Sequence, residues 1–495
     1  MVEAALVDWS RMQFALTAGY HWLFVPLTLG LAVIMALMET TYVVTGDEFW
    51  KRTAKFWMKI FAINFAVGIA TGIILEFEFG TNWSNYSWFV GDIFGAPLAI
   101  EGIFAFFMEA TFFAVMFFGW EKVGKRFHLA ATWFTGIGAA ISAVWILIAN
   151  SWMQHPVGME FNPDTVRHEM VDFWALVFNP IAISKFFHSV FSGWMTGAVF
   201  VIGISSWYLL KRRETRFALA SIRVATIVGI CGALAVMFSG DSSGVHAAKY
   251  QPMKLAAAEG LVEGGERAPF SIVPGVEIPA VLSILATHDV DGYVPGIDNI
   301  LDGYTTPDGE YHPSAEEKME RGRVAVESFT RYRELCDSDP EAAAEARRTL
   351  DENIEYFGYG YIDSREELVP PVGLVYWAFR VMVGVGGFLL MLMALILWLE
   401  RRRRLENKRW LLWVALLSIP LVYLAGQAGW VVAEVGRQPW VIDGLLPVKA
   451  AVSSVSVEAV QTTFWLFVAI FTLFLVIEVR IMIKAIKQGP NIETK

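Results

Sequence analysis

Nine long apolar runs constrain this chain more than any other feature of its sequence. Several exceed twenty residues, which as a helix is enough to cross about 30 Å of hydrocarbon. The 495-residue chain is 55% hydrophobic and only 18% charged, so we expect an all-α integral membrane protein with about nine transmembrane helices. The predicted spans are residues 12–42, 58–78, 95–119, 129–150, 181–210, 218–240, 373–399, 411–434 and 457–483.

Basic residues predict the orientation of these helices. Clusters of Lys and Arg lie where odd-numbered spans end and even-numbered spans begin, and that side of the membrane carries 22 of them. The opposite side, apart from one long loop, carries five: Arg11, Arg167, Lys185, Arg437 and Lys449. By the positive-inside rule the N-terminus is expected outside and the C-terminus in the cytoplasm.

One connection, the polar segment 241–372, is far longer than the others. It separates the membrane parts 1–240 and 373–495, and the predicted orientation makes it extracytoplasmic. Two stretches within it, Ala315–Arg333 and Ala342–Tyr356, have helix-like patterns. A loop this long in a compact protein is usually functional or disordered, and a charged cap without a function of its own is the alternative.

The segment 429–440 carries a carboxylate where an apolar helix ends. Glu434 lies in the last predicted turn, Gly436 follows the helix end, and Pro439 comes soon afterwards, as is usual for a helix stop. A carboxylate in or near a bilayer is costly unless it is paired, protonated or bound to a ligand, which makes Glu434 a functional candidate. The alternative is an ion pair with Arg437, three residues later.

Two histidines lie well inside predicted spans, and a methionine matches one of them in depth. His21 is in the first span, His188 in the fifth, and Met382 in the seventh, about as deep as His188. A neutral imidazole in a membrane either binds haem iron or forms a hydrogen bond between helices, and histidine with methionine is a low-spin haem pair. Arg380 is too deep to be a free cation, and a haem propionate would serve as its anion.

Two acids, Glu101 and Glu109, lie in the third span. Eight residues of standard helix separate them by about 12 Å along the axis and about 80° around it. They therefore share one broad face at successive depths, as a proton relay requires, unless each is paired with a basic residue on another helix. Ser142 and Asn150 in the fourth span either hold waters beside such a relay or join helices by hydrogen bonds.

These candidates agree in depth. Under the orientation chosen from the loop charges, five residues fall in the outer half of the membrane: His21, His188, Met382, Glu101 and Glu434. The orientation was chosen without them, so the agreement indicates a single redox layer.

Five motifs make the chain resemble subunit I of the cytochrome bd-type quinol oxidases over nearly its whole length. They are Gln13–His21 (QFALTAGYH), Phe79–Ser84 (FGTNWS), Gly91–Glu101, Gln251–Gly260 (QPMKLAAAEG) and Gly436–Trp440 (GRQPW). The resemblance implies a haem-binding bundle in a bacterial or archaeal plasma membrane. It implies a terminal oxidase that oxidises quinol near the outer face and reduces O2 to water with cytoplasmic protons, without a pump.

The resemblance also implies a set of haem ligands. His188 and Met382 would ligate a low-spin haem b, with Arg380 beside it. His21 and Glu434 would serve two high-spin haems, one b and one d. Which of the two uses which ligand stays open, and so does haem b in place of haem d.

Further roles follow from the same resemblance. Glu101 would lie beside the high-spin pair as a ligand or proton donor, and Glu109 would continue the proton path. Trp430 would lie between haems, and Arg437 would meet propionates. In some members a hydroxyl follows the second acid of the third span, whereas this chain has Ala110 there.

The resemblance places quinol at the long loop, where Lys254 and Glu259 would bind or deprotonate it. It implies a second large membrane subunit, and some members add a small single-helix subunit. We expect no nucleic-acid partner.

Two other classes of protein use similar features. A proton-coupled transporter would use the same buried acids but would not explain the matched depth of His188 and Met382, and the paired half-helix interruptions of inverted repeats are missing from the pattern. A dihaem b electron carrier without oxygen chemistry would typically use His–His pairs, whereas this chain has two histidines at membrane depth, on different helices.

Overall fold

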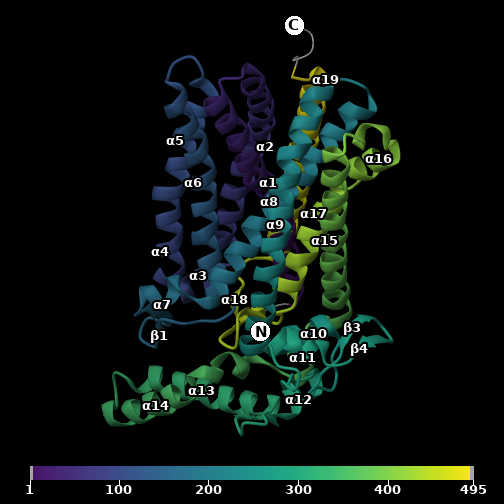
Figure 1. Ribbon diagram of the computed structural model, residues 1–495. Helices are drawn as coiled ribbons and strands as arrows, with labels where there is room; N and C mark the ends of the chain where they lie inside the picture. The colour runs from purple at the N-terminus through teal and green to yellow at the C-terminus, as the bar shows by residue number, and fades with distance from the viewer. Residues whose placement is uncertain (1–3, 491–495) are drawn as a thin grey trace.

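In the part of the chain that the structure describes, nine long helices form a bundle, and a layer of shorter helices and hairpins lies across one end of it (Figure 1). The computed structural model describes residues 4–490. Within that range nine helices are long and apolar enough to cross a membrane, which confirms the predicted number. Six are continuous: α1 (Ala4–Thr45), α2 (Glu48–Thr81), α6 (Lys125–Trp152), α9 (Thr215–Tyr250), α15 (Val372–Arg401) and α19 (Val457–Gln488). A seventh, α8 (Pro180–Leu210), follows the short α7 (Phe173–Val177).

The other two spans each contain a π-helical turn, and no further π-helix occurs in residues 4–490. The third span consists of α4 (Asp92–Ile100), η1 (Glu101–Phe106) and α5 (Phe107–Phe118). The eighth consists of α16 (Arg409–Leu417), α17 (Ile419–Trp430) and η5 (Val431–Val435). π-turns are rare in proteins as a whole, and those that occur are often at functional sites. One of these two contains Glu101 and the other contains Glu434.

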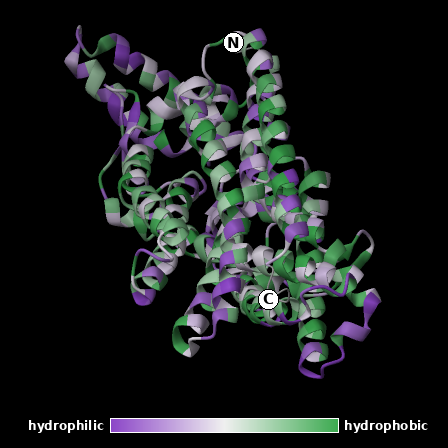
Figure 2. Ribbon diagram, turned by 90° about the horizontal axis from the view of Figure 1, so that it is seen from above, coloured by the Kyte–Doolittle hydropathy of each residue, from purple (hydrophilic) through white to green (hydrophobic). Residues whose placement is uncertain are grey.

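The helices extend beyond the predicted apolar runs because polar residues cap and continue them. α2 starts at Glu48, where the Asp47 carboxylate accepts a hydrogen bond of 2.9 Å from the backbone N–H of Phe49. α8 starts at Pro180 behind the side chain of Asn179, which caps it in the same way. Hydropathy locates the membrane part of a helix but not its ends. In Figure 2, long hydrophobic stretches follow the helices, and hydrophilic residues gather mainly in separate segments.

The main hydrophobic core of the bundle lies at the end opposite the layer of shorter helices and hairpins. Large side chains there, such as Trp57, Phe61 and Phe217, are fully buried. In the middle of the bundle α1 and α8 approach closely, since a Cβ added at Gly30 would lie 2.3 Å from the backbone oxygen of Gly193. Small residues allow such contact between membrane helices, where apolar burial gives no driving force.

The layer at the other end, which we call the loop layer, comprises residues 251–371. Its elements are α10 (Pro252–Glu259), β3 (Phe270–Val273), β4 (Val276–Ile278), α11 (Val281–Thr287), α12 (Ile297–Asp302), β5 (Tyr304–Thr305), β6 (Tyr311–His312), α13 (Ala315–Leu335), α14 (Pro340–Asn353), η2 (Ile354–Tyr361) and η3 (Arg365–Leu368). Short elements between the spans are α3 (Ser84–Val90), β1 (Met159–Asn162), β2 (Arg167–Met170), η4 (Leu405–Asn407), β7 (Trp440–Ile442), β8 (Leu446–Pro447) and α18 (Val448–Ala451). The strands form four antiparallel two-stranded hairpins.

The predicted boundary at residue 241 falls inside a helix, so the loop layer begins ten residues later than expected. α9 continues to Tyr250 and ends just before Pro252, which cannot continue a helix. Its last part packs against α11. The helix predicted at Ala315–Arg333 is confirmed as α13. The second, predicted over 342–356, is shifted: α14 begins at Pro340 and ends at Asn353, and a 3₁₀ segment follows.

Candidate functional site

The predicted ligand His21 is held in one tautomer by its neighbours on α2. Its Nδ1 lies 3.0 Å from the hydroxyl oxygen of Thr71. That hydroxyl has two backbone carbonyls within reach, Val67 at 3.1 Å and Gly68 at 3.0 Å, and donates to them. It therefore accepts from Nδ1–H of His21, which leaves the lone pair of Nε2 available for iron. A Cβ at Gly72 would lie 3.0 Å from Cε1 of the ring.

His188 on α8 has the same arrangement. Its Nδ1 lies 3.3 Å from the hydroxyl of Ser239 on α9, which itself donates to a backbone carbonyl at 2.8 Å. A Cβ at Gly240 would lie 3.3 Å from Cε1 of the ring. Met382 on α15 also faces a glycine, since a Cβ at Gly429 of α17 would lie 3.1 Å from its Sδ. Each of these three side chains thus packs against a glycine of a neighbouring helix, where a larger residue would crowd it.

The helices that carry these two ligands belong to one cluster. α8 packs against α9 and α17, and α15 packs against the same two helices. Trp430 lies in this cluster, directly after Gly429. Its ring contacts Trp22, next to His21, with 5.0 Å between ring centroids, and the ammonium of Lys185 lies 5.4 Å from the ring. Trp430 therefore lies between the segments that carry His21 and His188, as its predicted role requires.

Glu434 lies among four groups that stabilise its negative charge. Its carboxylate oxygens are 2.6 Å from Arg437, 3.1 Å from Asn150, 3.4 Å from Gln154 and 3.7 Å from Lys185. The ion pair that the sequence offered as an alternative is therefore present. Even with these partners, 27% of the Glu434 side chain stays exposed.

The surplus of positive charge around Glu434 fits an anionic cofactor. Arg437, Lys185 and Lys254 lie around two acids, Glu434 and Asp443, and Nε of Arg437 is buried with no hydrogen-bond partner among the described residues. A buried donor without a partner is costly and rare in folded proteins. A carboxylate such as a haem propionate would satisfy it, which agrees with the predicted role of Arg437. Imidazole and thioether groups are established ligands of haem iron, so His21, His188 and Met382 fit haem.

Arg380 and Glu259, which the sequence assigned to different sites, form one ion pair. Nη2 of Arg380 lies 2.7 Å from Oε2 of Glu259 and also donates to the backbone oxygen of Ser271. Nη1 donates to the backbone oxygen of Ala258 at 2.5 Å. The anion that Arg380 needs is therefore supplied by the loop layer. Its Nε is still buried without a partner, so a propionate can accept a further hydrogen bond there.

Lys254 is buried where α10 meets the bundle. Its ammonium donates to the side-chain oxygens of Gln154 at 2.8 Å and Gln251 at 2.6 Å. Burial lowers the pKa of Lys254 well below its ordinary value, and nearby Lys185 adds to the effect. Because Gln154 also reaches Glu434, one amide joins the predicted quinol residue to the predicted iron ligand.

Glu259 has the opposite shift. Burial raises the pKa of Glu259 above its ordinary value, and Arg380 partly offsets this. A carboxylate shifted toward working pH is suited to take a proton from a bound hydroxyl.

The two acids of the third span both face α6. The carboxylate of Glu101 accepts a hydrogen bond of 2.6 Å from the hydroxyl of Ser142. One helical turn away, a Cβ at Gly138 would lie 3.0 Å from Cβ of Glu109. The π-turn η1 lies between the acids, so the standard helical geometry assumed from the sequence was wrong in detail. The shared face was predicted and is present.

A protein-family model for subunit I of the cytochrome bd terminal oxidases matches residues 9–490. The chain belongs to this family. It is 42% identical over 516 residues to the cytochrome bd-II ubiquinol oxidase subunit 1 of Escherichia coli (strain K12), covering 98% of this chain and 97% of that protein. It is 38% identical to the cytochrome bd ubiquinol oxidase subunit 1 of Bacillus subtilis (strain 168), with coverage of 97% and 94%.

A solved structure confirms the fold. The bd oxidase from Geobacillus thermodenitrificans superimposes with a TM-score of 0.79 at 24% identity, over 99% of this chain and 100% of that one. Family membership makes the chain a subunit of a cytochrome bd terminal oxidase, a multi-pass membrane protein that bears haem.

Several polar residues of this cytochrome bd subunit had no role in the sequence reasoning. Gln154 follows the fourth span and gave no signal. Lys185 was counted only as a loop charge, although it lies three residues before His188. Glu78 is a buried acid of α2 that accepts a hydrogen bond of 3.1 Å from Thr17; its place inside an apolar run was a signal that was not used.

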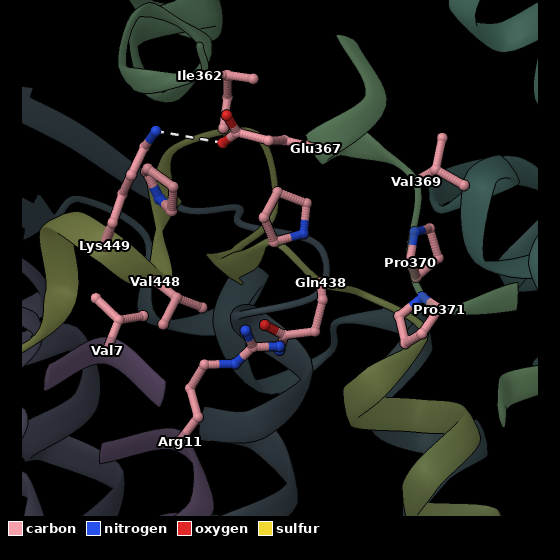
Figure 3. A pocket seen from close by; sticks show the side chains of 12 residues that line it. Val7, Arg11, Ile362, Glu367, Val369, Pro370, Pro371, Gln438, Val448 and Lys449 are labelled. Atoms are coloured by element: carbon pink, nitrogen blue, oxygen red, sulfur yellow. Dashed lines mark hydrogen bonds and ion pairs between the residues drawn. The ribbon is translucent and has the colours of Figure 1, made fainter. Parts of the chain in front are cut away.

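A cavity of about 490 Å³ opens beside the GRQPW segment of the cytochrome bd subunit. Figure 3 shows its lining, drawn from the start of α1, the end of the loop layer, the GRQPW segment and the start of α18, with an ion pair of 3.2 Å between Lys449 and Glu367. Gln438 lines it and donates to the backbone oxygen of Glu434 at 3.1 Å. The cavity thus borders the site without including a predicted ligand.

Proposed function

We propose that this chain is the catalytic subunit of a respiratory quinol oxidase that reduces O2 to water. Electrons would enter from quinol at the loop layer, and protons for water would come from the opposite side of the membrane. The observation that carries the proposal is the matched setting of His21 and His188. Each has its Nδ1 beside a hydroxyl that donates to the backbone, which leaves the lone pair of Nε2 for iron.

The proposed cofactors are two haem b groups, one low-spin and one high-spin, and one haem d or a third haem b. When bound, these groups supply electron transfer and the binding and reduction of O2. His188 and Met382 would hold the low-spin group, and His21 and Glu434 the high-spin pair. Nε of Arg380 and Nε of Arg437 would bind propionates.

At the loop layer, Glu259 would accept a proton from quinol and Lys254 would orient the headgroup. Both side chains are buried, and each is fixed by neighbours rather than free to reorient. The raised pKa of Glu259 supports its role as the base. The loop layer would then bind quinol and transfer protons, and would not be a mere cap on the transmembrane bundle.

The positive-inside rule places the loop layer and the N-terminus outside and the C-terminus in the cytoplasm. α1 begins and α19 ends at opposite ends of the bundle, as this orientation requires (Figure 1). Glu109 and then Glu101 would deliver protons inward from the cytoplasm, so turnover would be electrogenic without a pump. We further propose a second large membrane subunit and a small single-helix subunit as partners in a bacterial or archaeal plasma membrane.

Loop variants should separate quinol oxidation from haem chemistry. Lys254→Ala or Glu259→Gln should lower quinol oxidation roughly tenfold or more, because a charge-assisted contact to the headgroup is worth about 1.5–3 kcal/mol. An artificial electron donor should still reduce the haems and support oxygen uptake in both variants. Oxygen-electrode assays with each donor measure the two activities.

Glu266→Gln is the matched control, since this acid of the same layer is exposed. It should leave both activities unchanged. Wild-type quinol turnover in both Lys254→Ala and Glu259→Gln would show that the layer is only a cap.

A further inference from the structure

A buried ion pair joins α1 and α6 near the end of the bundle opposite the loop layer. Oε1 of Glu39 lies 2.6 Å from Nδ1 of His128, and the two side chains are 1% and 2% exposed. The hydroxyl of Thr132 donates to Oε2 of Glu39 at 2.5 Å. Nε2 of His128 lies 2.9 Å from the backbone oxygen of Met116 on α5. None of these groups takes part in the function proposed above.

The hydrogen bonds of this pair place one transferable proton. A backbone oxygen can only accept, so Nε2 of His128 carries a hydrogen toward Met116. Nδ1 and Oε1 then share a second proton, as imidazolium with carboxylate or as neutral imidazole with carboxylic acid. A pair that can hold this proton on either partner is suited to receive one and pass one on.

The pair lies just beneath the basic surface at this end. The ring of His128 lies against that of Trp120 in the connection between α5 and α6, tilted by 33° with 4.0 Å between ring centroids. The ammonium of Lys55 lies 4.9 Å from the ring centroid of the same tryptophan. One side chain therefore separates the pair from the surface that faces the cytoplasm in the proposed orientation.

From this pair, polar groups continue along one face of α6 toward the acids of the third span. His128, Thr132, Thr135 and Ser142 follow at steps of four, three and seven residues, which is the spacing of a single helix face. Ser142 is the group that hydrogen-bonds Glu101.

The α5 side leads to the same place. Met116 lies seven residues after Glu109, two turns along α5 and about 10 Å along the axis. A few hydrogen-bonded waters span such a distance. The ion pair and Glu109 therefore lie at successive depths beside the same two helices.

We propose that Glu39, His128 and Thr132 form the cytoplasmic mouth of the proton path that continues to Glu109 and Glu101. In each transfer one proton enters the pair from the cytoplasmic side and one leaves toward Glu109, so that the pair regains its charge and no electron moves. The inference rests on the proposed function and adds the residues that load its proton path.

The test uses the purified holoenzyme in proteoliposomes. Glu39→Gln keeps the size and hydrogen bonding of the side chain but removes the transferable proton. It should slow proton uptake and the associated electrical signal by roughly 10²-fold, within the range for a lost acid–base group. Haem content and the rate at which quinol reduces the haems should stay at wild-type values. His128→Ala should be equally slow, and added imidazole should restore part of its proton uptake.

Thr40→Val is the matched control. It removes a hydrogen bond of 3.1 Å between the same two helices, from Trp133 to the Thr40 hydroxyl, and no titratable group is lost. Normal proton uptake in Thr40→Val beside slow uptake in Glu39→Gln supports the proposal. Wild-type proton uptake in both Glu39→Gln and His128→Ala overturns the proposal. Loss of haem from Glu39→Gln, or an equal defect in Thr40→Val, also overturns it, because the pair then has a structural role. If the wild-type protein itself does not oxidise quinol, the proposed function fails first.

Discussion

Replacing Glu101 by glutamine should leave haem at least partly bound and slow oxygen reduction by about 10²- to 10⁴-fold. Glutamine keeps the shape of the side chain and can still accept the hydrogen bond from Ser142, but it cannot exchange a proton. Glu101 lies in one of the two π-turns of residues 4–490 and carries the predicted role of proton donor at the oxygen site. Rapid mixing of the reduced enzyme with O2, together with haem quantification, measures both effects.

Companion variants separate the roles of the two acids. Glu101→Ala should go further and disturb the high-spin haems, because a ligand or close neighbour is lost. Glu109→Gln should leave the haem spectra near normal and slow proton uptake from inside. If Glu101→Gln reduces oxygen at the full rate, the two acids are structural and the inward path runs elsewhere.

Met382→Leu should keep the fold but abolish the low-spin haem signal or shift its reduction potential downward. Leucine has nearly the volume of methionine, and such exchanges usually cost less than about 1.5 kcal/mol. It lacks the thioether that favours reduced iron. A reduced-minus-oxidised spectrum combined with a redox titration of the purified protein measures the change.

Met393→Leu is the control for this variant. Met393 lies on the same helix, is 1% exposed and packs against Gly229 in the main core. It should show an unchanged spectrum and potential. The assignment of Met382 fails if Met382→Leu also keeps the wild-type low-spin spectrum and potential.

The nine spans were predictable because a membrane helix is marked in the sequence by a long continuous apolar run. The loop charges gave an orientation, and the helix stop after Glu434 lies where Gly436 and Pro439 indicated it. The face shared by Glu101 and Glu109 followed from helical spacing alone. What could be predicted therefore depended on residues close together in the sequence.

The remaining features depend on residues far apart in the chain. Arg380 and Glu259 are 121 residues apart and pair only because α10 folds back onto α15. Glu39 and His128 are 89 residues apart. The depth of Arg380 indicated that it needs an anion, but at such separations spacing gives no signal for which residue is its partner.

The π-turns were missed for another reason. Nothing in residues 101–106 or 431–435 distinguishes a π-turn from an α-helix by composition. A π-turn interrupts the regular α-helical hydrogen bonding, so it persists where tertiary contacts or a bound group stabilise it. The contacts of Glu101 with Ser142 and of Glu434 with Asn150 are of this kind, and only the folded structure shows them.

One measurement tests the central claim most directly: the reduced-minus-oxidised spectrum of the purified complex, with quinol as the only reductant. Exposure to carbon monoxide and extraction of the haems complete it. We predict that quinol reduces one low-spin and two high-spin haems, that carbon monoxide shifts a high-spin band, and that oxygen reoxidises all three. A protein without haem would be a transporter. A protein with low-spin haem b alone, unaffected by carbon monoxide and not reoxidised by O2, would be an electron carrier. Either result would contradict the account.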